Sequence, residues 1–184
     1  MPRIDTEVDV AEELKRYDEI LESAWDEFET LGLAVPSRPD RERGKYTIPQ
    51  WPEDITRLTD QELHHLHGQF EEFLRYITGQ VAVSKSNLKV HKEKATLVRA
   101  AVRKRTSGKN KEERDDNTML DNLYQDVRQD ELYWSTLHGL QESLRDIFEG
   151  DVKAISRQMT QREVQANVGA RHANVGNRPF RPKK

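Results

Sequence analysis

An unbroken heptad repeat in the middle of the chain constrains the fold more than any other feature of the sequence. Between Phe70 and Val102, ten positions alternate in steps of four and three residues, and eight of them are apolar. Such spacing aligns the ten side chains along one face of an α-helix, where they need a partner surface. The members of this seam are Phe70, Leu74, Ile77, Val81, Ser84, Leu88, His91, Ala95, Val98 and Val102. The repeat therefore predicts a long helix that packs against another helix, because so polar a helix would not be stable alone.

Local signals predict where this long helix begins and ends. Thr59 and Glu62 form a capping-box pattern, in which each side chain hydrogen-bonds the backbone N–H of the other residue. The polar residues 106–110 predict the end of the helix and a short loop. A further apolar periodicity over residues 116–164 predicts a second long helix, and a short loop makes the two helices antiparallel neighbours. The expected fold is all-α, a long antiparallel helical hairpin over residues 59–166.

The segments that flank the hairpin differ from it in composition. Residues 8–31 place apolar side chains at helical spacing beside an acidic face, which predicts an additional N-terminal helix. Residues 32–58 include four prolines and are expected to form an irregular strap. We therefore divide the chain into an acidic helix with its strap (1–58), the hairpin, and a disordered, flexible basic C-terminal tail (167–184).

Composition excludes several classes of protein. Apolar and charged residues each make up 34% of the chain, which suits extended helices better than a thick core. Cysteine is absent, so disulfides and thiolate metal sites are excluded. No run of 18 apolar residues exists, and the N-terminus lacks the apolar region of a secretory signal. We expect a cytoplasmic protein without a membrane partner.

No catalytic motif is recognisable, and we expect a protein that is not an enzyme and needs no cofactor or metal. Residues 107–109, Ser-Gly-Lys, lack the first glycine of a phosphate-binding loop and are interpreted as a helix-ending turn. His64, His65 and His67 have no recognised metal-ligand spacing around them. His67 continues the seam backwards, which favours a partly buried, hydrogen-bonded histidine.

Charge is segregated along the chain, and one block is strongly basic. Residues 81–114 contain 11 basic and 3 acidic side chains. The helix dipole favours a few cations near a helix C-terminus, but not eleven. Such a cluster could neutralise phosphates, although no aromatic side chain interleaves it. The residues expected to contact DNA are Lys92, Lys94, Arg99, Arg103, Lys104, Arg105 and Lys109. The alternative is a solvated or protein-binding face.

Two polar residues interrupt the seam one heptad apart. Ser84 and His91 are interpreted as setting the register or the oligomeric state. The sequence does not tell whether the seam is filled within one chain or between copies, and we expect a homo-oligomer. The residues expected to serve assembly are Leu74, Ile77, Val81, Ser84, Leu88, His91, Val98 and Trp134.

An order of features connects the chain to a known family. A lysine-rich helix leads into Arg-Ala-Ala-Val-Arg-Lys-Arg-Thr-Ser-Gly at 99–108, and a polar, acidic loop follows. Leu-Tyr-Trp at 132–134, Leu-Arg-Asp-Ile-Phe at 144–148 and Ala-Ile-Ser-Arg at 154–157 come next. In this order, residues 70–165 resemble phage recombination mediators of the UvsY type.

The resemblance implies a function. It implies a small helical protein of DNA recombination and repair that self-assembles into a ring or similar oligomer. It also implies single-stranded DNA binding through the basic region and help in loading a recombinase onto DNA coated by a single-strand-binding protein. A phage-encoded chain would act in the host-cell cytoplasm. The alternative function is a structural or scaffold-like helical component of a virion or complex, with no DNA binding.

Overall fold

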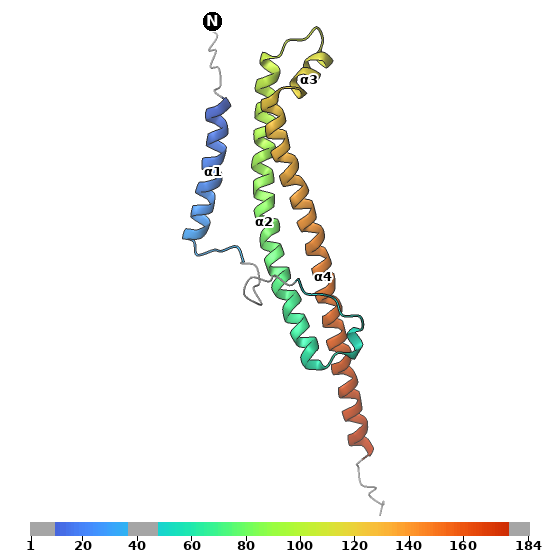
Figure 1. Cartoon of the computed structure of the whole chain (residues 1–184). Helices are drawn as coiled ribbons and strands as arrows, with labels where there is room; N and C mark the ends of the chain where they lie inside the picture. Colours follow the sequence, from blue (N-terminus) through green and yellow to red (C-terminus); the bar gives the residue numbers. More distant parts are fainter. Residues whose placement is uncertain (1–9, 37–47, 177–184) are drawn as a thin grey trace, which may run out of the picture. The chain divides into compact units, whose positions relative to one another are not determined.

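The protein is all-α, as the sequence predicts. The computed structural model describes residues 10–36 and 48–176. The described elements are α1 (Val10–Thr30), the 3-10 helix η1 (Ile55–Arg57), α2 (Asp60–Arg105), α3 (Lys111–Met119) and α4 (Asn122–Gly176) (Figure 1). The long helices α2 and α4 pack antiparallel, which confirms the helical hairpin. None of the helices in the described ranges is long and apolar enough to span a membrane.

The start of α2 is fixed by the capping box that the sequence predicts. The backbone N–H of Thr59 donates to Oε2 of Glu62 over 2.7 Å, and the N–H of Glu62 donates to Oγ1 of Thr59 over 3.3 Å. The hydrogen bonds from Thr59 lower the pKa of Glu62, because they stabilise its carboxylate. The helix ends at Arg105, at the polar loop. Both boundaries agree with the local signals.

The second arm begins differently from the single helix expected from residue 116. The side chain of Asn110 accepts from the N–H of Glu113 over 2.8 Å and starts the short helix α3. Eleven residues further, Oδ1 of Asp121 accepts from the N–H of Leu123 over 3.0 Å and starts α4. Since each cap satisfies a separate helix start, the chain breaks between α3 and α4.

At its other end, α4 extends beyond the boundary that the sequence predicts. The basic tail was expected from residue 167, whereas α4 continues to Gly176. Adding residues to a formed helix costs much less than nucleating one, so a long helix can continue past Gly169. The expected tail is therefore helical over residues 167–176, and residues 177–184 lie outside the described residues.

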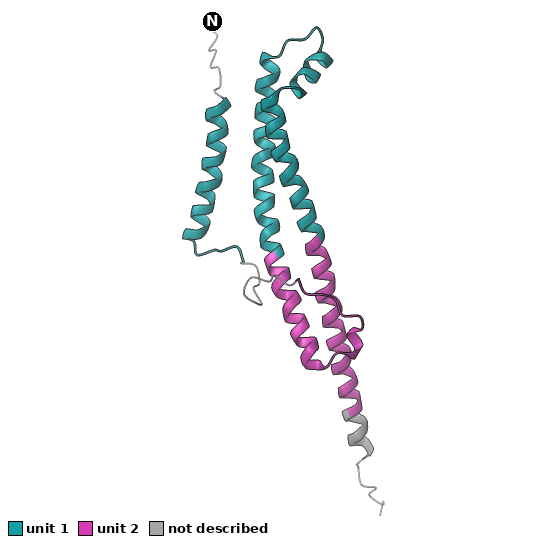
Figure 2. Ribbon diagram, in the orientation of Figure 1, with its two compact units in different colours: residues 1–36, 77–143 teal, residues 37–76, 144–184 magenta. Residues whose placement is uncertain are grey.

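Two compact units divide the chain (Figure 2). Unit 2 comprises Ser37–Tyr76 and Leu144–Lys184. Its core contains a phenylalanine cluster: the ring centroid of Phe148 on α4 lies 5.6 Å from that of Phe70 and 5.8 Å from that of Phe73, both on α2. Arg162 of α4 ties down the strap, since its guanidinium donates to the carbonyl oxygen of Thr56 and to Asp60.

Unit 1 comprises Met1–Pro36 and Ile77–Ser143 and contains α1, α3 and the remaining stretches of α2 and α4. Its core joins α2 to the start of α4, and α1 covers one side of it. The buried members are Ala95, Val98, Val102, Tyr124 and Val127, with Val10 and Leu14 of α1 packed against them. No residue of α1 is itself buried, so α1 lies on the surface of this unit.

The chain that follows α1 passes very close to α2. A Cβ atom placed on Gly79 would lie 2.8 Å from Cδ of Pro36 and 3.1 Å from Cγ1 of Val35. Any side chain at Gly79 would push this segment away from α2. The contact explains a glycine in the middle of a long helix, where it otherwise costs stability.

The heptad seam is filled within the chain. Seven of its apolar members and Ser84 are less than 9% exposed. These buried positions extend along the whole seam, from Phe70 to Val102, each of which is 1% exposed. Leu74 and His91 are partly exposed. The partner surface that the repeat requires is therefore supplied by the chain's own helices.

Candidate nucleic-acid interface

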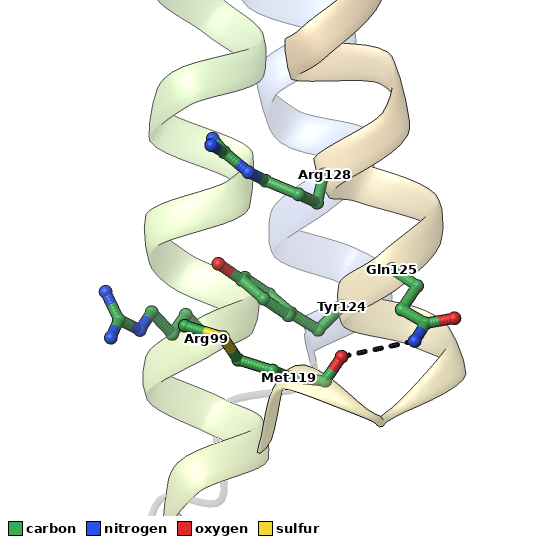
Figure 3. A pocket seen from close by; sticks show the side chains of 5 residues that line it. All are labelled: Arg99, Met119, Tyr124, Gln125 and Arg128. Atoms are coloured by element: carbon green, nitrogen blue, oxygen red, sulfur yellow. Dashed lines mark hydrogen bonds between the residues drawn. The ribbon is translucent and has the colours of Figure 1, made fainter. Parts of the chain in front are cut away.

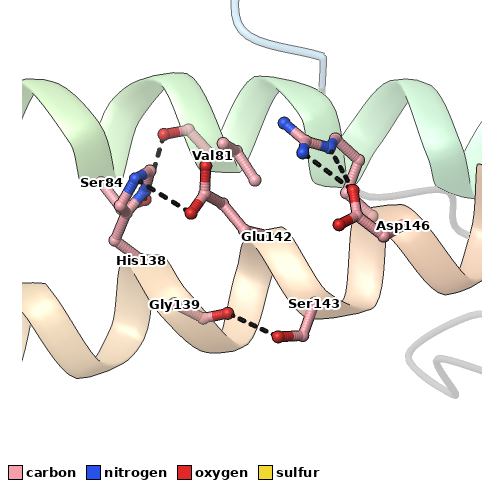
Figure 4. A network of polar contacts seen from close by, with 8 residues as sticks. Val81, Ser84, His138, Gly139, Glu142, Ser143 and Asp146 are labelled. Atoms are coloured by element: carbon pink, nitrogen blue, oxygen red, sulfur yellow. Dashed lines mark hydrogen bonds and ion pairs between the residues drawn. The ribbon is translucent and has the colours of Figure 1, made fainter.

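A serine, a histidine and a glutamate meet inside the hairpin of unit 1 (Figure 4). Oγ of Ser84 lies 3.1 Å from Nδ1 of His138, and Nε2 of His138 lies 3.6 Å from Oε2 of Glu142. Ser84 is only 1% exposed, and its hydroxyl donates to the carbonyl oxygen of Val81. Because a hydroxyl has a single proton, Ser84 accepts from His138 and has no proton to give it. The arrangement fits a polar pair that fixes helix register, not an activated nucleophile.

The second polar position of the seam also meets a partner on α4. The rings of His91 and Trp134 stack with centroids 6.0 Å apart, and Nδ1 of His91 lies 3.8 Å from Oδ2 of Asp130. Burial lowers the pKa of His91, the charge of Lys94 lowers it further, and the carboxylates of Asp130 and Asp18 raise it. Ser84 and His91 thus each contact one histidine or tryptophan of the other arm, as register-setting residues would.

The histidines near the start of α2 do not gather into a metal site. Nε2 of His67 lies 2.8 Å from Oγ of Ser156 on α4, which confirms the expected hydrogen-bonded histidine. His64 and His65 are exposed, and His65 contacts Gln69 on its own helix. Among the side chains that the structure describes, in residues 10–36 and 48–169, no group of three or more His, Asp or Glu could hold a metal ion.

The basic residues that the sequence singles out divide into two groups. Three of them are engaged in ion pairs: Lys94 with Asp18, Arg103 with Asp115 and Arg105 with Asp121. The other four, Lys92, Arg99, Lys104 and Lys109, have exposed side chains and form no ion pair with any described residue.

Lys94 departs most from its expected role as a DNA contact. It is 8% exposed and donates to Asp18 of α1. α1 carries eight acidic and two basic residues, so this helix presents a carboxylate where a phosphate would have to bind. Lys94 therefore holds α1 against α2 and is not open to DNA in this arrangement.

Arg103 and Arg105 close the hairpin tip. Nε of Arg103 lies 3.1 Å from Oδ1 of Asp115 on α3. A terminal nitrogen of Arg105 lies 2.8 Å from Oδ2 of Asp121, the residue that caps α4. Burial raises the pKa of Asp121, but the hydrogen bonds from Arg105 and the backbone leave it below its usual value. Both arginines thus have local structural partners.

A hollow in unit 1 brings two of the four exposed cations, Lys92 and Arg99, together with residues of α4, and Figure 3 shows the part of it that Arg99 lines. One part of it, about 430 Å³, is lined by Arg99, Met119, Tyr124, Gln125 and Arg128. An adjoining part of about 300 Å³ shares three of these residues and adds Lys92, Ala95, Thr96 and Glu131. We call these nine residues the basic groove. It joins Lys92 and Arg99 of α2 to Arg128 of α4, which follows Arg99 by 29 positions in sequence.

The electrostatics of the basic groove favour an anion. Lys92, Arg99 and Arg128 supply positive charge, and Glu131 is the single carboxylate in the lining. Arg128 donates to Glu131, and that hydrogen bond raises the pKa of the guanidinium. Arginine is charged at any physiological pH, so the three cations persist. Among the described residues, Glu131 is the carboxylate with which a phosphate would compete for Arg128.

The structure also places an aromatic residue among these cations, which the sequence did not predict. Tyr124 lines both parts of the basic groove, with its hydroxyl directed towards α2 (Figure 3). Nε2 of Gln125 donates to the carbonyl oxygen of Met119 over 3.3 Å and so holds the end of α3 beside the groove. Surfaces that bind single-stranded nucleic acid combine a basic groove with aromatic side chains, and Tyr124, which is 9% exposed and belongs to the core of unit 1, is the aromatic residue in this lining.

The sequence prediction missed Arg128, Tyr124 and Met119 as site residues. They come from outside the basic block of residues 81–114, and Arg128 stands in an acidic stretch. One signal was present: Tyr124 and Val127 fall on the apolar side of the second arm, so Arg128 borders the hairpin interface. To predict which residue of α2 lies opposite Arg128, one must know the register between the two arms.

The residues expected to serve assembly lie inside the hairpin. Ile77, Val81, Ser84, Leu88 and Val98 are at most 8% exposed. Leu74, His91 and Trp134 are partly exposed. Contacts between copies through this seam would require the hairpin to open. In unit 1, α4 instead carries Leu132, Tyr133 and Leu140 on its surface, and each of them is at least 59% exposed.

Comparison with known proteins adds no family to these observations. No protein-family model, no curated protein and no solved structure matches the chain.

Proposed function

We propose that the protein is a single-stranded DNA-binding accessory protein of the recombination-mediator type. The observation that carries the proposal is the basic groove, where Lys92, Arg99 and Arg128 line one hollow around Tyr124. Cations that neutralise phosphates supply most of the affinity for a nucleic-acid backbone, and an aromatic wall adds contact with bases.

The wider role follows from the resemblance to phage recombination mediators. In that role the protein self-assembles and helps to load a recombinase onto DNA that a single-strand-binding protein covers. The recombinase, the single-strand-binding protein and the homo-oligomer are therefore the proposed partners. The groove supports the DNA-binding part of this role.

The test is fluorescence anisotropy of a labelled single strand of roughly 30 nucleotides, over a series of salt concentrations, with a duplex for comparison. We expect tight binding at low salt, a preference for the single strand and a steep loss of affinity as salt rises. The double variant Arg99→Glu, Arg128→Glu reverses two charges in the groove and is expected to lose more than about tenfold in affinity.

A matched control separates the groove from net charge. Lys153→Glu with Arg157→Glu makes the same charge change at two exposed positions of α4 in unit 2. This control is expected to bind nearly as well as the parent protein. Equal losses in both double variants would show that binding depends on overall charge and would remove the groove from the proposal.

A structural assembly protein without DNA binding is the second candidate function. The exposed apolar side chains of Leu132, Tyr133 and Leu140 on α4 favour it, because exposed apolar surface often marks contact with another protein. Absence of DNA binding at low salt, together with self-association in sedimentation experiments, would make this function the leading one.

A further inference from the structure

The break between α3 and α4 forms one wall of the basic groove. At this break α3 ends at Met119, and α4 starts three residues later at Asn122. Met119 remains 51% exposed, whereas Tyr124 beside it is 9% exposed. The groove is therefore walled at this point by the side chains of Met119 and Tyr124, and Arg99 and Arg128 also belong to its lining.

Phosphate binding alone does not account for this wall. A phosphate is met by cations and N–H donors, and an apolar thioether adds nothing to that contact. A nucleobase has two flat faces and a polar edge. Flat faces stack on aromatic rings and on arginine guanidinium planes, and methionine sulfur packs well against aromatic rings.

The groove also offers polar groups for the edge of a base. The Tyr124 hydroxyl makes no hydrogen bond with the residues that the structure describes. The side-chain oxygen of Gln125 is likewise unused, since its amide nitrogen makes the contact with Met119. The hollow has a volume of about 430 Å³ and is partly open to solvent.

Resting on the proposed function, we propose that the basic groove takes up one unstacked nucleobase beside Met119 and Tyr124, while Arg99 and Arg128 hold the adjoining phosphates. Bases in a duplex are stacked and paired, so moving one out of the duplex has a free-energy cost that is much smaller for a single strand. The site would therefore supply the preference for single strands. It would tolerate any sequence, because every base has a stacking face.

The test compares an intact strand with a strand of equal length and charge whose central residues are abasic. We expect the parent protein to bind the intact strand on the order of tenfold more tightly, as loss of one stacked base predicts. A strand that carries 2-aminopurine is expected to change its fluorescence on binding, since that signal reports base stacking. This second readout needs no variant of the protein.

Neighbouring residues at the break supply a matched pair of variants. Met119→Ala removes a side chain that lines the groove, whereas Leu120→Ala removes one that is 69% exposed and does not line it. Met119→Ala should shrink the difference between intact and abasic strands, and Leu120→Ala should preserve it. Circular dichroism checks that both variants keep their helix content.

The outcomes separate this inference from the proposed function. Equal affinity for intact and abasic strands, with no 2-aminopurine response, would overturn the base site and leave phosphate binding in place. Failure of both strands to bind at low salt would overturn the base site and the proposed function together. A base effect that both alanine variants retain would place base contact elsewhere on the protein and overturn the site at Met119.

Discussion

Replacing Arg128 with glutamine should weaken single-strand binding more than the same replacement of Arg105, although Arg105 stands in the basic block and Arg128 does not. Arg128 lines the basic groove, and Glu131 is its ion-pair partner among the described residues. Arg105 lies 2.8 Å from Asp121 at the hairpin tip and is absent from the groove lining. The two variants therefore test whether the groove or the linear cluster binds DNA.

The expected magnitude follows from the contacts of each arginine. A cation that neutralises one phosphate of a single strand contributes about 0.7 to the slope of log affinity against log salt. Arg128 must exchange an exposed ion pair for the phosphate, so the net loss should be ~1 kcal/mol, or roughly fivefold in affinity. For Arg105→Gln we expect a change of less than about twofold.

Anisotropy titrations at several salt concentrations give both the affinity and its dependence on salt. Thermal melting shows whether each variant folds. Glu131→Gln should have the opposite effect on DNA affinity, because it frees Arg128 from its ion pair and removes the only carboxylate in the lining of the groove. It should bind more tightly than the parent protein. A larger loss from Arg105→Gln than from Arg128→Gln would refute the groove and return the DNA contact to the hairpin tip.

Two further predictions concern the fold. Phe148→Ala should cost about 3–5 kcal/mol in urea unfolding, because the ring is 3% exposed and packs on two phenylalanines of α2. Tyr133→Ala, at a side chain 61% exposed, should change stability little, and similar losses from both would contradict the aromatic core. The pKa of His91 is lowered from 6.5 by burial and by Lys94, against the charge of Asp130, so the folded state favours the neutral ring. Stability from this residue should be complete above pH 6.5 and decline as pH falls through the folded pKa, and His91→Gln should flatten that decline. Parallel pH profiles of unfolding for parent and variant would count against this role.

Lys94 illustrates why the basic block could not be interpreted from sequence alone. It is one of eleven cations between residues 81 and 114, and nothing in its neighbourhood separates it from Lys92. In the fold, Lys92 is exposed in the basic groove, whereas Lys94 is buried under α1 with Asp18. Two residues along a helix differ by about 200° in direction, so adjacent cations serve opposite faces.

The sequence by itself determined the elements of this protein. Three local patterns carry this information: the heptad seam, the Thr59 capping box and the polar loop at 106–110. Because helical geometry is regular, each of them predicts a helix or a helix boundary without knowledge of the partner surface. They sufficed for an all-α hairpin with an N-terminal helix. They also made Ser84 and His91 conspicuous, because an interruption is visible against a regular repeat.

Only the tertiary structure decided what meets across the hairpin. The seam is buried by the chain's own helices, Ser84 pairs with His138, and Arg128 joins Arg99 and Tyr124 in one groove. These pairings depend on the register between two long helices. The caps at Asn110 and Asp121 divide the second arm into α3 and α4, so the start of α4 is fixed by Asp121. A periodic pattern repeats at every turn and is compatible with several registers. Packing of particular side chains against each other selects one of them, and with it the residues that share a site.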